Sequence, residues 1–351
     1  MNDLAVRVCP KVAIIVLNWN NWRDSLACLD SLAKIAYTNY DIVLLDNASE
    51  DDSVEHLKEY CARKAKPDTG SITYWADSPA IKVIEYSIEP AKTDHYDEHN
   101  KTSFLGKRLT FIANDTNDGF TGGNNLAMTY ALRELTPDYV LLLNNDTVVD
   151  KGFLRELVDA AESDPDVGFA GPRIYYCNLN GKTNVIQSAG GTINFSRGTN
   201  KDLKALREDE GQDYETNEVD YVSGACMLTK KRVIDNIGML DPYYFMFWEE
   251  LDWCVRARNA GYKCLQVPTS RIWHKISLSK WGGGFCYYQA RNKFWFLKKN
   301  GTRKEYLSAL IFFFLYEFWF WTGFFLLRRR NSGEFVAFVK GTRDGLWAVR
   351  R

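Results

Sequence analysis

The sequence predicts an α/β protein built on a doubly wound, mostly parallel sheet and followed by a C-terminal hydrophobic helical segment. In the first half, short apolar runs alternate with stretches whose apolar residues recur at helical spacing. This alternation is typical of parallel strands joined by crossover helices. Polar clusters follow three of the apolar runs directly, which is the pattern expected where strands of an open sheet end beside a ligand.

The individual elements follow from these patterns in chain order. Val12–Asn18 is a continuous β-rich run, which suits a strand buried on both faces. Further strands are predicted at Ile42–Leu45, Thr110–Ala113 and Tyr139–Leu143. Helices are predicted at 22–35, from Ser49 to about Cys61 with an acidic first turn, and at Asn124–Leu135.

Two polar stretches interrupt the pattern. Residues 67–108 mix Pro, Gly and polar residues with short β-like runs such as Ile81–Tyr86, and we interpret them as an insertion at one edge, with a β-hairpin as one option. Residues 196–218 are interpreted as a mobile loop, because loops of this length are either functional lids or poorly ordered.

Residues 306–327 form an apolar segment whose single charge is Glu317. The segment is long enough to span a bilayer core of about 30 Å. Basic residues flank both ends, whereas a single span favours them on its cytoplasmic side. A helix lying in the membrane interface, a re-entrant hairpin and a buried core helix therefore remain alternatives to a span. We expect a catalytic domain over residues 1–300 and a membrane-associating tail over 301–351.

Composition excludes some classes of partner and site. The formal net charge of -1 gives no overall attraction to nucleic acid, and we expect no nucleic-acid partner. The eight cysteines include no C-x-x-C pair, so they are interpreted as reduced structural thiols. The first apolar run is too short for a secretory signal, so we expect the folded part in the cytoplasm. Nothing in the sequence specifies an oligomeric state.

The three polar clusters at predicted strand ends are candidates for binding a polar ligand. They are Asn18-Trp19-Asn20-Asn21, Asp46-Asn47-Ala48-Ser49 and Asn144-Asn145-Asp146. A lone cluster of this kind is more often a turn with a helix cap. Three clusters at the same end of one sheet instead favour a ligand site.

A glycine-rich stretch at residues 117–125, Asn-Asp-Gly-Phe-Thr-Gly-Gly-Asn-Asn, opens the third predicted helix. Glycines at a helix N-terminus let a phosphate or sugar approach exposed N–H groups. The stretch is not G-x-G-x-x-G, and the chain has no P-loop motif, so a dinucleotide dehydrogenase or P-loop NTPase fits poorly.

Acidic residues and one histidine are candidates for metal binding and catalysis. Asp146 follows a buried strand, where a carboxylate suits Mg²⁺ or Mn²⁺, and His274 could share the ion. The densest acidic cluster, Glu249, Glu250 and Asp252, lies among aromatic residues. Desolvation there raises a carboxylate pKa and suits a general base. On a helix, Glu249 and Asp252 share one face while Glu250 points elsewhere. The plainer interpretation is an acidic first turn of a helix.

The core of the sequence resembles glycosyltransferase family 2, with the GT-A fold, and especially its rhamnosyltransferase-like branch. The resembling motifs cover about residues 10–300 in order. They are Val-Leu-Asn-Trp-Asn-Asn (16–21), Leu-Asp-Asn-Ala-Ser-Glu-Asp-Asp-Ser (45–53), the glycine stretch (117–125), Leu-Leu-Asn-Asn-Asp-Thr (142–147), Val-Ser-Gly-Ala-Cys-Met-Leu (222–228) and Phe-Trp-Glu-Glu-Leu-Asp-Trp-Cys-Val-Arg (247–256). The resemblance implies a GT-A mixed sheet that binds a nucleotide-diphosphate sugar.

The resemblance also implies roles for single residues. Asp46 would hold the nucleotide base or ribose, Asn144 would lie near the ribose, and Asp146 with His274 would bind Mg²⁺ or Mn²⁺. Glu250 aligns with the presumed base, although the family usually has Glu-Asp where this chain has Glu249-Glu250, and Asn144 replaces one carboxylate of the family's D-x-D. The full donor-binding set expected from the motifs is Asn18, Asn20, Asp46, Asn47, Gly119, Gly122, Gly123, Asn124, Asn144 and Asn145.

The implied activity is inverting, metal-dependent transfer of rhamnose or another hexose to a lipid-linked or cell-surface glycan, at the cytoplasmic face of a membrane. Two alternatives stay open. A sugar-nucleotide pyrophosphorylase would need a Gly-rich, Lys/Arg-bearing loop after the first strand, where this chain has Asn18-Trp19-Asn20-Asn21. A catalytically impaired, membrane-associated glycan-binding or scaffold protein on the same fold is kept open by the departures at Asn144 and Glu250.

Overall fold

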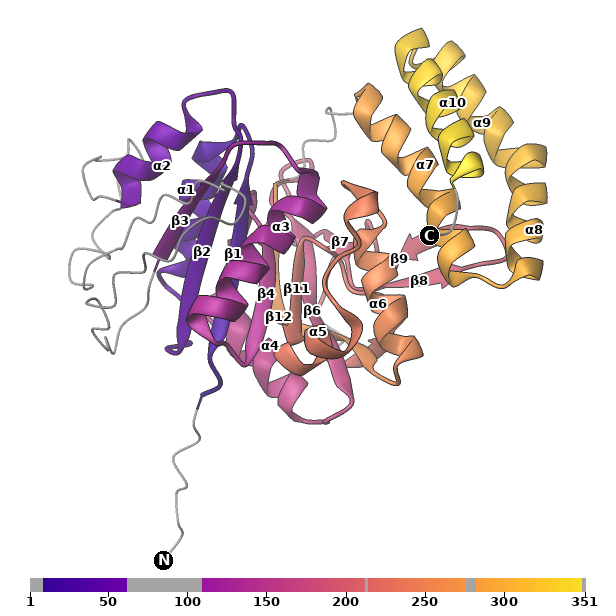
Figure 1. The fold of residues 1–351 in the computed structure, drawn as a ribbon. Helices are drawn as coiled ribbons and strands as arrows, with labels where there is room; N and C mark the ends of the chain where they lie inside the picture. Colours follow the sequence, from indigo (N-terminus) through magenta and orange to yellow (C-terminus); the bar gives the residue numbers. More distant parts are fainter. Residues whose placement is uncertain (1–8, 62–108, 212–213, 276–281, 349–351) are drawn as a thin grey trace, which may run out of the picture.

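The computed structural model describes residues 9–61, 109–211, 214–275 and 282–348 of the 351-residue chain. Within these ranges the chain forms one large mixed sheet with helices on both faces and a group of helices at the C-terminus (Figure 1). The strand order along the sheet is β10-β12-β6-β11-β4-β1-β2-β3, with β5 paired to β12 and β7 paired to β6. The prediction of a doubly wound mixed α/β sheet is confirmed.

The first four predicted strands form the parallel part of the sheet, and antiparallel pairs begin where β11 joins β4. The strands of the large sheet are β1 (Val12–Asn18), β2 (Tyr40–Asn47), β3 (Leu109–Asn114), β4 (Tyr139–Asn144), β5 (Thr147–Val149), β6 (Val167–Tyr176), β7 (Ile186–Ser188), β10 (Asn217–Val219), β11 (Cys226–Lys230) and β12 (Lys263–His274). A separate hairpin pairs β8 (Gly191–Asn194) with β9 (Thr199–Asp202).

Helices cover both faces of the sheet because successive residues of each strand point to opposite sides. In β1, Ile14 belongs to the core beneath α1, α2 and α4, whereas Ile15 belongs to the core beneath α3, α5 and α6. These helices are α1 (Trp22–Leu32), α2 (Ser53–Cys61), α3 (Gly119–Tyr130) continued by a π-helical turn (Ala131–Leu135), α4 (Phe153–Glu162), α5 (Lys231–Ile237) and α6 (Glu249–Asn259).

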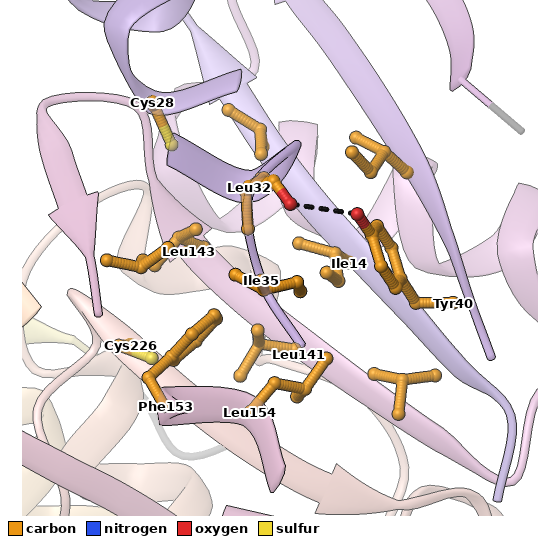
Figure 2. Close-up of a cluster of buried hydrophobic side chains, with 14 of the residues drawn as sticks. Ile14, Cys28, Leu32, Ile35, Tyr40, Leu141, Leu143, Phe153, Leu154 and Cys226 are labelled. Carbon is orange, nitrogen blue, oxygen red and sulfur yellow. Dashed lines mark hydrogen bonds between the residues drawn. The ribbon is translucent and has the colours of Figure 1, made fainter. Parts of the chain in front are cut away.

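The core beneath α1 and α4 is formed by residues of the apolar runs together with residues of these helices (Figure 2). Leu32 of α1, Ile14 and Leu141 of the central strands and Phe153 of α4 are all buried there. The one polar group that Figure 2 shows entering this core is the Tyr40 hydroxyl, which donates a hydrogen bond to the Leu32 carbonyl oxygen over 2.8 Å. The continuous apolar runs therefore form strands buried on both faces, as predicted.

The C-terminal region consists of α7 (Gly283–Asn300), a long helix over Arg303–Arg328 and α10 (Ser332–Trp347). The long helix comprises α8 (Arg303–Phe312), α9 (Phe318–Gly323) and two π-helical stretches (Phe313–Glu317 and Phe324–Arg328). It begins at a capping box in which Thr302 and Glu305 satisfy each other's backbone N–H groups. The long helix and α10 pack on α7 through a shared core that includes Phe294, Phe313, Phe325 and Phe338 (Figure 1).

Two sequence predictions need comment. The insertion predicted at 67–108 lies outside the described residues. The interpretation of 196–218 as a mobile loop is wrong in part, because β9 and β10 lie within it and β9 pairs with β8. The side chains of β9 are polar, so the strand has no apolar run in the sequence. It is fixed instead by pairing and by hydrogen bonds of Asp202 with Ser188 and Tyr221.

Candidate active site

The predicted strand-end residues Asn18 and Asp46 lie side by side because β1 and β2 are parallel and in register. The Asn18 amide donates to Asp46 Oδ1 over 2.7 Å, and the Ser49 hydroxyl and backbone N–H donate to the same carboxylate. Asn18 and Asp46 are completely buried. They therefore form the floor of the site, with their polar atoms already engaged by protein.

Asn20 and Asn145 connect this floor to its neighbours. Asn20 adopts a left-handed backbone conformation (φ 51°), and its side-chain oxygen accepts the backbone N–H of Glu50 over 2.7 Å. Asn145 donates to the side chains of Asn18 and Ser25 over 3.2 and 2.9 Å. The ends of β1, β2 and β4 are thus fixed as one rigid unit.

The glycine-rich stretch is held by Asn47, whose amide donates to Asn117 Oδ1 and to the Gly119 carbonyl oxygen, both over 3.0 Å. Asn124, also in the predicted donor-binding set, is buried and donates to the carbonyl oxygen of Phe120. The N–H groups of Gly119, Thr121 and Gly122 already donate to Asn117, Phe245 and Asp118, respectively.

The glycines are required by close packing against protein rather than by free space for a ligand. A Cβ on Gly119 would lie 2.4 Å from the Phe245 carbonyl oxygen, and Gly119 also has φ +71°. A Cβ on Gly123 would lie 2.7 Å from Leu17, and one on Gly122 would lie 2.5 Å from the Cβ of Asp118. The three N–H groups named above are engaged and the glycines pack tightly, so this stretch has a packing role, and donor binding by Gly119, Gly122 and Gly123 stays a prediction.

Asp146 and His274 come together because β4 ends at Asn144 and the following β5 pairs with the end of β12. His274 Nε2 lies 2.9 Å from Asp146 Oδ1. Burial raises the pKa of Asp146, but the hydrogen bond and charge of His274 outweigh it, so the net pKa is lower than usual. The carboxylate is therefore charged at neutral pH.

The Asp146–His274 pair fits a divalent cation. When His274 Nδ1 carries the proton it donates to Gln187 Oε1 over 3.1 Å, which leaves a lone pair on Nε2. Adjacent ligands of an octahedral ion with bonds of ~2.1 Å lie roughly 3 Å apart, close to the observed separation. No group of three or more His, Cys, Asp or Glu residues that could hold a metal occurs in the described residues. Mg²⁺ and Mn²⁺ suit such a site, because they accept few protein ligands and complete their shell with phosphate oxygens and water.

Asn144 lies on the neighbouring strand end, half-buried, with its backbone N–H donating to the Ala225 carbonyl oxygen. Its side chain is an amide at the position where the family motif has a carboxylate. The cation site thus has one protein carboxylate, Asp146, and a neutral neighbour.

The three candidate bases occupy different environments at the start of α6. Asp252 is completely buried and accepts hydrogen bonds from Arg256, Lys299 and Asn300 over 2.8, 2.9 and 2.9 Å. Glu249 is buried on the same side, and burial raises its pKa well above the usual value. Asp252 therefore anchors α6 to α7, and Glu249, 5% exposed, has a buried Oε2 without a hydrogen-bond partner. Their predicted catalytic roles stay predictions.

Glu250 points away from these two and is the partly exposed member of the cluster. Burial of its carboxyl group, reinforced by the negative charge of Asp202, raises its pKa to about 7. Its Oε2 atom is buried without a hydrogen-bond partner. A carboxylate with a pKa near neutrality and an unused oxygen has the properties of a general base.

The loop before α6 is strained and is held by α7. Phe245, Phe247 and Trp248 all have positive φ (62°, 68° and 75°), which is costly for non-glycine residues. The completely buried Asn292 amide donates to the carbonyl oxygens of Tyr244, Met246 and Phe247 over 2.7–2.9 Å. This contact fixes the backbone that places Glu250.

Sequence reasoning missed the residues that connect the two halves of the site. Gln187 of β7 bonds His274, and its neighbour Ser188 donates to Asp202 over 2.8 Å. Asp202 also accepts the Tyr221 hydroxyl over 3.1 Å, and its charge acts on Glu250. Two neighbouring residues of β7 thus contact His274 on the one hand and, on the other, Asp202, whose charge acts on Glu250. The sequence carries no signal for this link, because β7 is three residues long and β9 is polar.

Comparisons with known proteins agree with this geometry. Residues 101–306 match the model of a family described as glycosyltransferase like family 2, and residues 13–74 match that of glycosyl transferase family 2. A low-salt glycan biosynthesis hexosyltransferase of Haloferax volcanii is 35% identical over 53% of this chain and 59% of its own length. An N-acetylglucosaminyl-diphospho-decaprenol L-rhamnosyltransferase of Mycobacterium tuberculosis is 28% identical over 39% of this chain and 47% of its own. The chain thus spans only about half the length of these curated relatives.

Two solved structures share the fold. GalNAc-T7, solved with UDP, GalNAc and Mn²⁺, superposes with a TM-score of 0.55 at 18% identity, covering 81% of this chain and 48% of that one. The mannosyltransferase PcManGT from Pyrobaculum calidifontis, solved with GDP-Man and Mn²⁺, gives 0.52 at 13% identity over 96% and 87%. The predicted GT-A fold is confirmed.

Proposed function

The chain belongs to glycosyltransferase family 2, and on that premise we propose that it is an inverting glycosyltransferase that moves rhamnose or another hexose from a nucleotide-diphosphate donor to a glycan acceptor. The observation that carries the proposal is a couple suited to a cation, Asp146 and His274, linked through Gln187 and Ser188 of β7 to Asp202, whose charge acts on a base of raised pKa, Glu250. The names of the relatives, a hexosyltransferase and a rhamnosyltransferase, support the class of sugar.

In this mechanism Glu250 accepts the proton of the acceptor hydroxyl on a carboxylate oxygen. The freed oxygen attacks the anomeric carbon of the donor from the face opposite the diphosphate, forming the new glycosidic bond as the bond to the diphosphate breaks. One displacement inverts the configuration, and no second carboxylate is needed as a nucleophile. A divalent cation held by Asp146 and His274 would supply positive charge beside the leaving diphosphate.

The strand-end residues hold the donor site in shape. Asp46 and Asn18 are buried and bonded to each other, so we assign them to the floor on which the nucleotide lies. Asn144, the last residue of the adjacent strand β4, is the proposed ribose contact. The glycine-rich stretch shapes this site by holding the Phe245 loop, through the hydrogen bond from the Thr121 N–H to the Phe245 carbonyl oxygen.

Thermal unfolding with a panel of nucleoside diphosphates, each with and without Mn²⁺, tests the proposal. One nucleotide is expected to raise the unfolding temperature, and to do so further with Mn²⁺, because a ligand of the native state at 100 times its Kd adds ~2.7 kcal/mol of stability. Nucleoside monophosphates serve as the matched control. A panel in which no diphosphate gives a Mn²⁺-dependent shift would contradict the proposed donor site.

We also propose that the long C-terminal helix places the enzyme at a membrane surface, on the cytoplasmic face. This helix, Arg303–Arg328, is long and apolar enough to cross a membrane by length and composition, with a mean hydropathy of 1.8 over its most apolar window, of which 11% is buried. Its inner stripe contacts α7 and α10 and includes Glu317, paired with Lys293. Its outer stripe, Leu307, Ile311, Leu315 and Trp319, is 50–65% exposed. A helix whose outer stripe faces water would carry polar residues there, so this apolar outer stripe suits contact with lipid.

The packing of this helix favours a position in the membrane interface over a span. The long helix lies beside α7 and α10 (Figure 1), which carry charged residues such as Arg291, Lys298, Lys340 and Arg343. A span would draw these charges into the hydrocarbon core, which is costly. An interfacial position instead buries only the outer stripe, with basic residues at both ends near lipid headgroups.

Flotation with anionic phospholipid vesicles tests the membrane contact. The pair Leu315→Ser and Trp319→Ser is expected to lower the vesicle partition coefficient by at least ~10²-fold, because each apolar side chain buried in lipid is worth ~1.5–3 kcal/mol. Leu206→Ser is the matched control, since Leu206 is 67% exposed on the catalytic part. Equal flotation of wild type and the Leu315/Trp319 variant would exclude this surface.

A further inference from the structure

A cavity of about 260 Å³ lies where α7, the long helix, α10 and the turn between β8 and β9 meet. The turn reaches this position because Gly198, with φ +63°, packs directly on α7 and the long helix, where a Cβ would lie 2.7 Å from Leu297. The lining is mainly apolar and aromatic, and includes Phe285, Ala290, Phe313, Trp321, Phe325 and Phe338.

Two further lining residues connect the cavity to the proposed base. Trp248 is the residue that caps α6, two positions before Glu250, and its indole N–H donates to Gln289 of the cavity wall over 2.8 Å. Asn200 donates to the Tyr221 hydroxyl over 3.2 Å, and Tyr221 in turn bonds Asp202, whose charge acts on Glu250. The cavity therefore borders the residues around Glu250 rather than the Asp146–His274 pair.

The opposite wall belongs to the helix whose outer stripe suits lipid. Phe313, Glu317, Trp321 and Phe325 follow one another at helical spacing along the inner stripe of the long helix. The charged lining residues, Lys293 and Glu317, are paired with each other. Since that pair neutralises its own charge, the wall as a whole favours an apolar occupant.

We propose that this cavity binds the first part of the hydrocarbon chain of a lipid-linked acceptor, with the acceptor sugar extending toward Glu250. The inference rests on the proposed function, and it narrows the acceptor from glycans in general to glycans on a lipid carrier. Such an acceptor must touch both a membrane-facing helix and the catalytic base, and the cavity joins the two. Ligand pockets for whole small molecules are ~300–1,000 Å³, so this one takes a short segment while the rest of the chain stays in the bilayer.

Photolabelling of the full chain in detergent micelles with a polyprenyl diphosphate that carries a benzophenone on its first isoprene units tests the proposal. Crosslinks mapped by mass spectrometry are expected on α7 and on the inner stripe of the long helix. Ala290→Phe, which fills the cavity, is expected to reduce labelling about tenfold. Ala290→Leu fills less of the cavity and is the variant to use if Ala290→Phe does not fold. Leu206→Ser is the matched control and should keep its labelling, because Leu206 is exposed on the catalytic part and does not line the cavity.

Hydrolysis of the nucleotide-sugar donor is measured in parallel, because it reports on the donor site without an acceptor. If the protein hydrolyses the donor but the crosslinks lie outside the cavity, the acceptor cavity is overturned and the proposed function stands. The same holds if labelling is unchanged in both Ala290 variants. The acceptor cavity would also be overturned if phosphatidylcholine competes with the photoprobe as strongly as unlabelled polyprenyl diphosphate does, since the cavity would then hold membrane lipid. Cavity labelling in a protein without donor hydrolysis or donor binding would count against the proposed function instead.

Discussion

Replacing Glu250 with Gln is expected to lower kcat by about 10²- to 10⁴-fold, the usual contribution of a general base, with little change in the KM for the donor. The substitution keeps the size of the side chain and removes its ability to take a proton. The Glu250 Cβ lies 3.4 Å from the position that a Cβ on Gly224 would occupy, and the amide, which has the shape of the carboxylate, fits the same space. Initial rates of product formation with saturating donor measure the effect.

The pH dependence of the activity tests whether Glu250 is the base. Its pKa is raised to about 7 by burial and by the charge of Asp202, and a base works only when deprotonated. Wild-type activity should therefore be full well above pH 7 and fall about tenfold for each unit below it. Glu250→Gln should lack this acidic limb. Asp235→Asn is the matched control, since Asp235 is exposed on α5 and pairs with Lys231, and it should keep the limb.

The same raised pKa has a consequence for stability that does not involve activity. Between pH 4.5 and about 7 the folded protein holds a proton on Glu250 that the unfolded chain releases, so stability falls as pH rises through this window. At pH 8 the Gln variant should therefore unfold at a higher temperature than the wild type. A variant that loses turnover but unfolds at or below the wild-type temperature would indicate a disturbed fold and contradict the assignment of Glu250 as the base.

Sequence patterns were sufficient for the parts of the fold that local interactions determine. The run Val12–Asn18 and its parallel partners form strands as predicted, since a continuous apolar run is stable only where both faces are covered. Helical spacing also placed Glu249 and Asp252 on one buried side of α6 and Glu250 on another. The arrangement of strand ends at one edge then followed from parallel pairing.

The contacts that decide what each site residue does were not predictable, because their partners are distant in the chain. Asp252 is engaged by Lys299 and Asn300, and the strained Phe245 loop is held by Asn292, from a helix that begins at Gly283. No periodicity or motif near residue 250 carries that information. The packing role of the glycine-rich stretch was not predictable for the same reason, because the group that packs on Gly119 is Phe245.

The apolar segment 306–327 shows how tertiary structure narrows the alternatives that a sequence pattern leaves open. Length and hydropathy of 306–327 fit a span, an interfacial helix or a buried helix. The long helix exposes Leu315, Trp319 and Phe320 by 63–65%, which excludes a helix buried in the core. Glu317, the single charge of the segment, pairs with Lys293 of α7.

Replacing Asp146 with Ala is expected to abolish the Mn²⁺-dependent part of donor binding and to lower kcat/KM by at least ~10²-fold, because a bound cation contributes several kcal/mol of charge stabilisation. Asp146 is the carboxylate of the couple, and its lowered pKa keeps it charged at neutral pH. His274→Ala should cause a smaller loss, since the imidazole contributes a neutral ligand. Isothermal titration of the nucleoside diphosphate with and without Mn²⁺ measures the cation-dependent increment directly.

Asp235→Ala is the matched control for this prediction, since Asp235 is an exposed aspartate on α5 whose charge pairs with Lys231. It should leave both the Mn²⁺ increment and turnover unchanged. The Asp146 variant should still bind the nucleotide weakly without Mn²⁺, because Asp46, Asn18 and Asn145 are held by one another and not by Asp146. If Asp146→Ala keeps the full Mn²⁺ increment, the cation lies elsewhere. If the variant also loses the Mn²⁺-independent binding, Asp146 supports the whole strand-end floor rather than the cation alone.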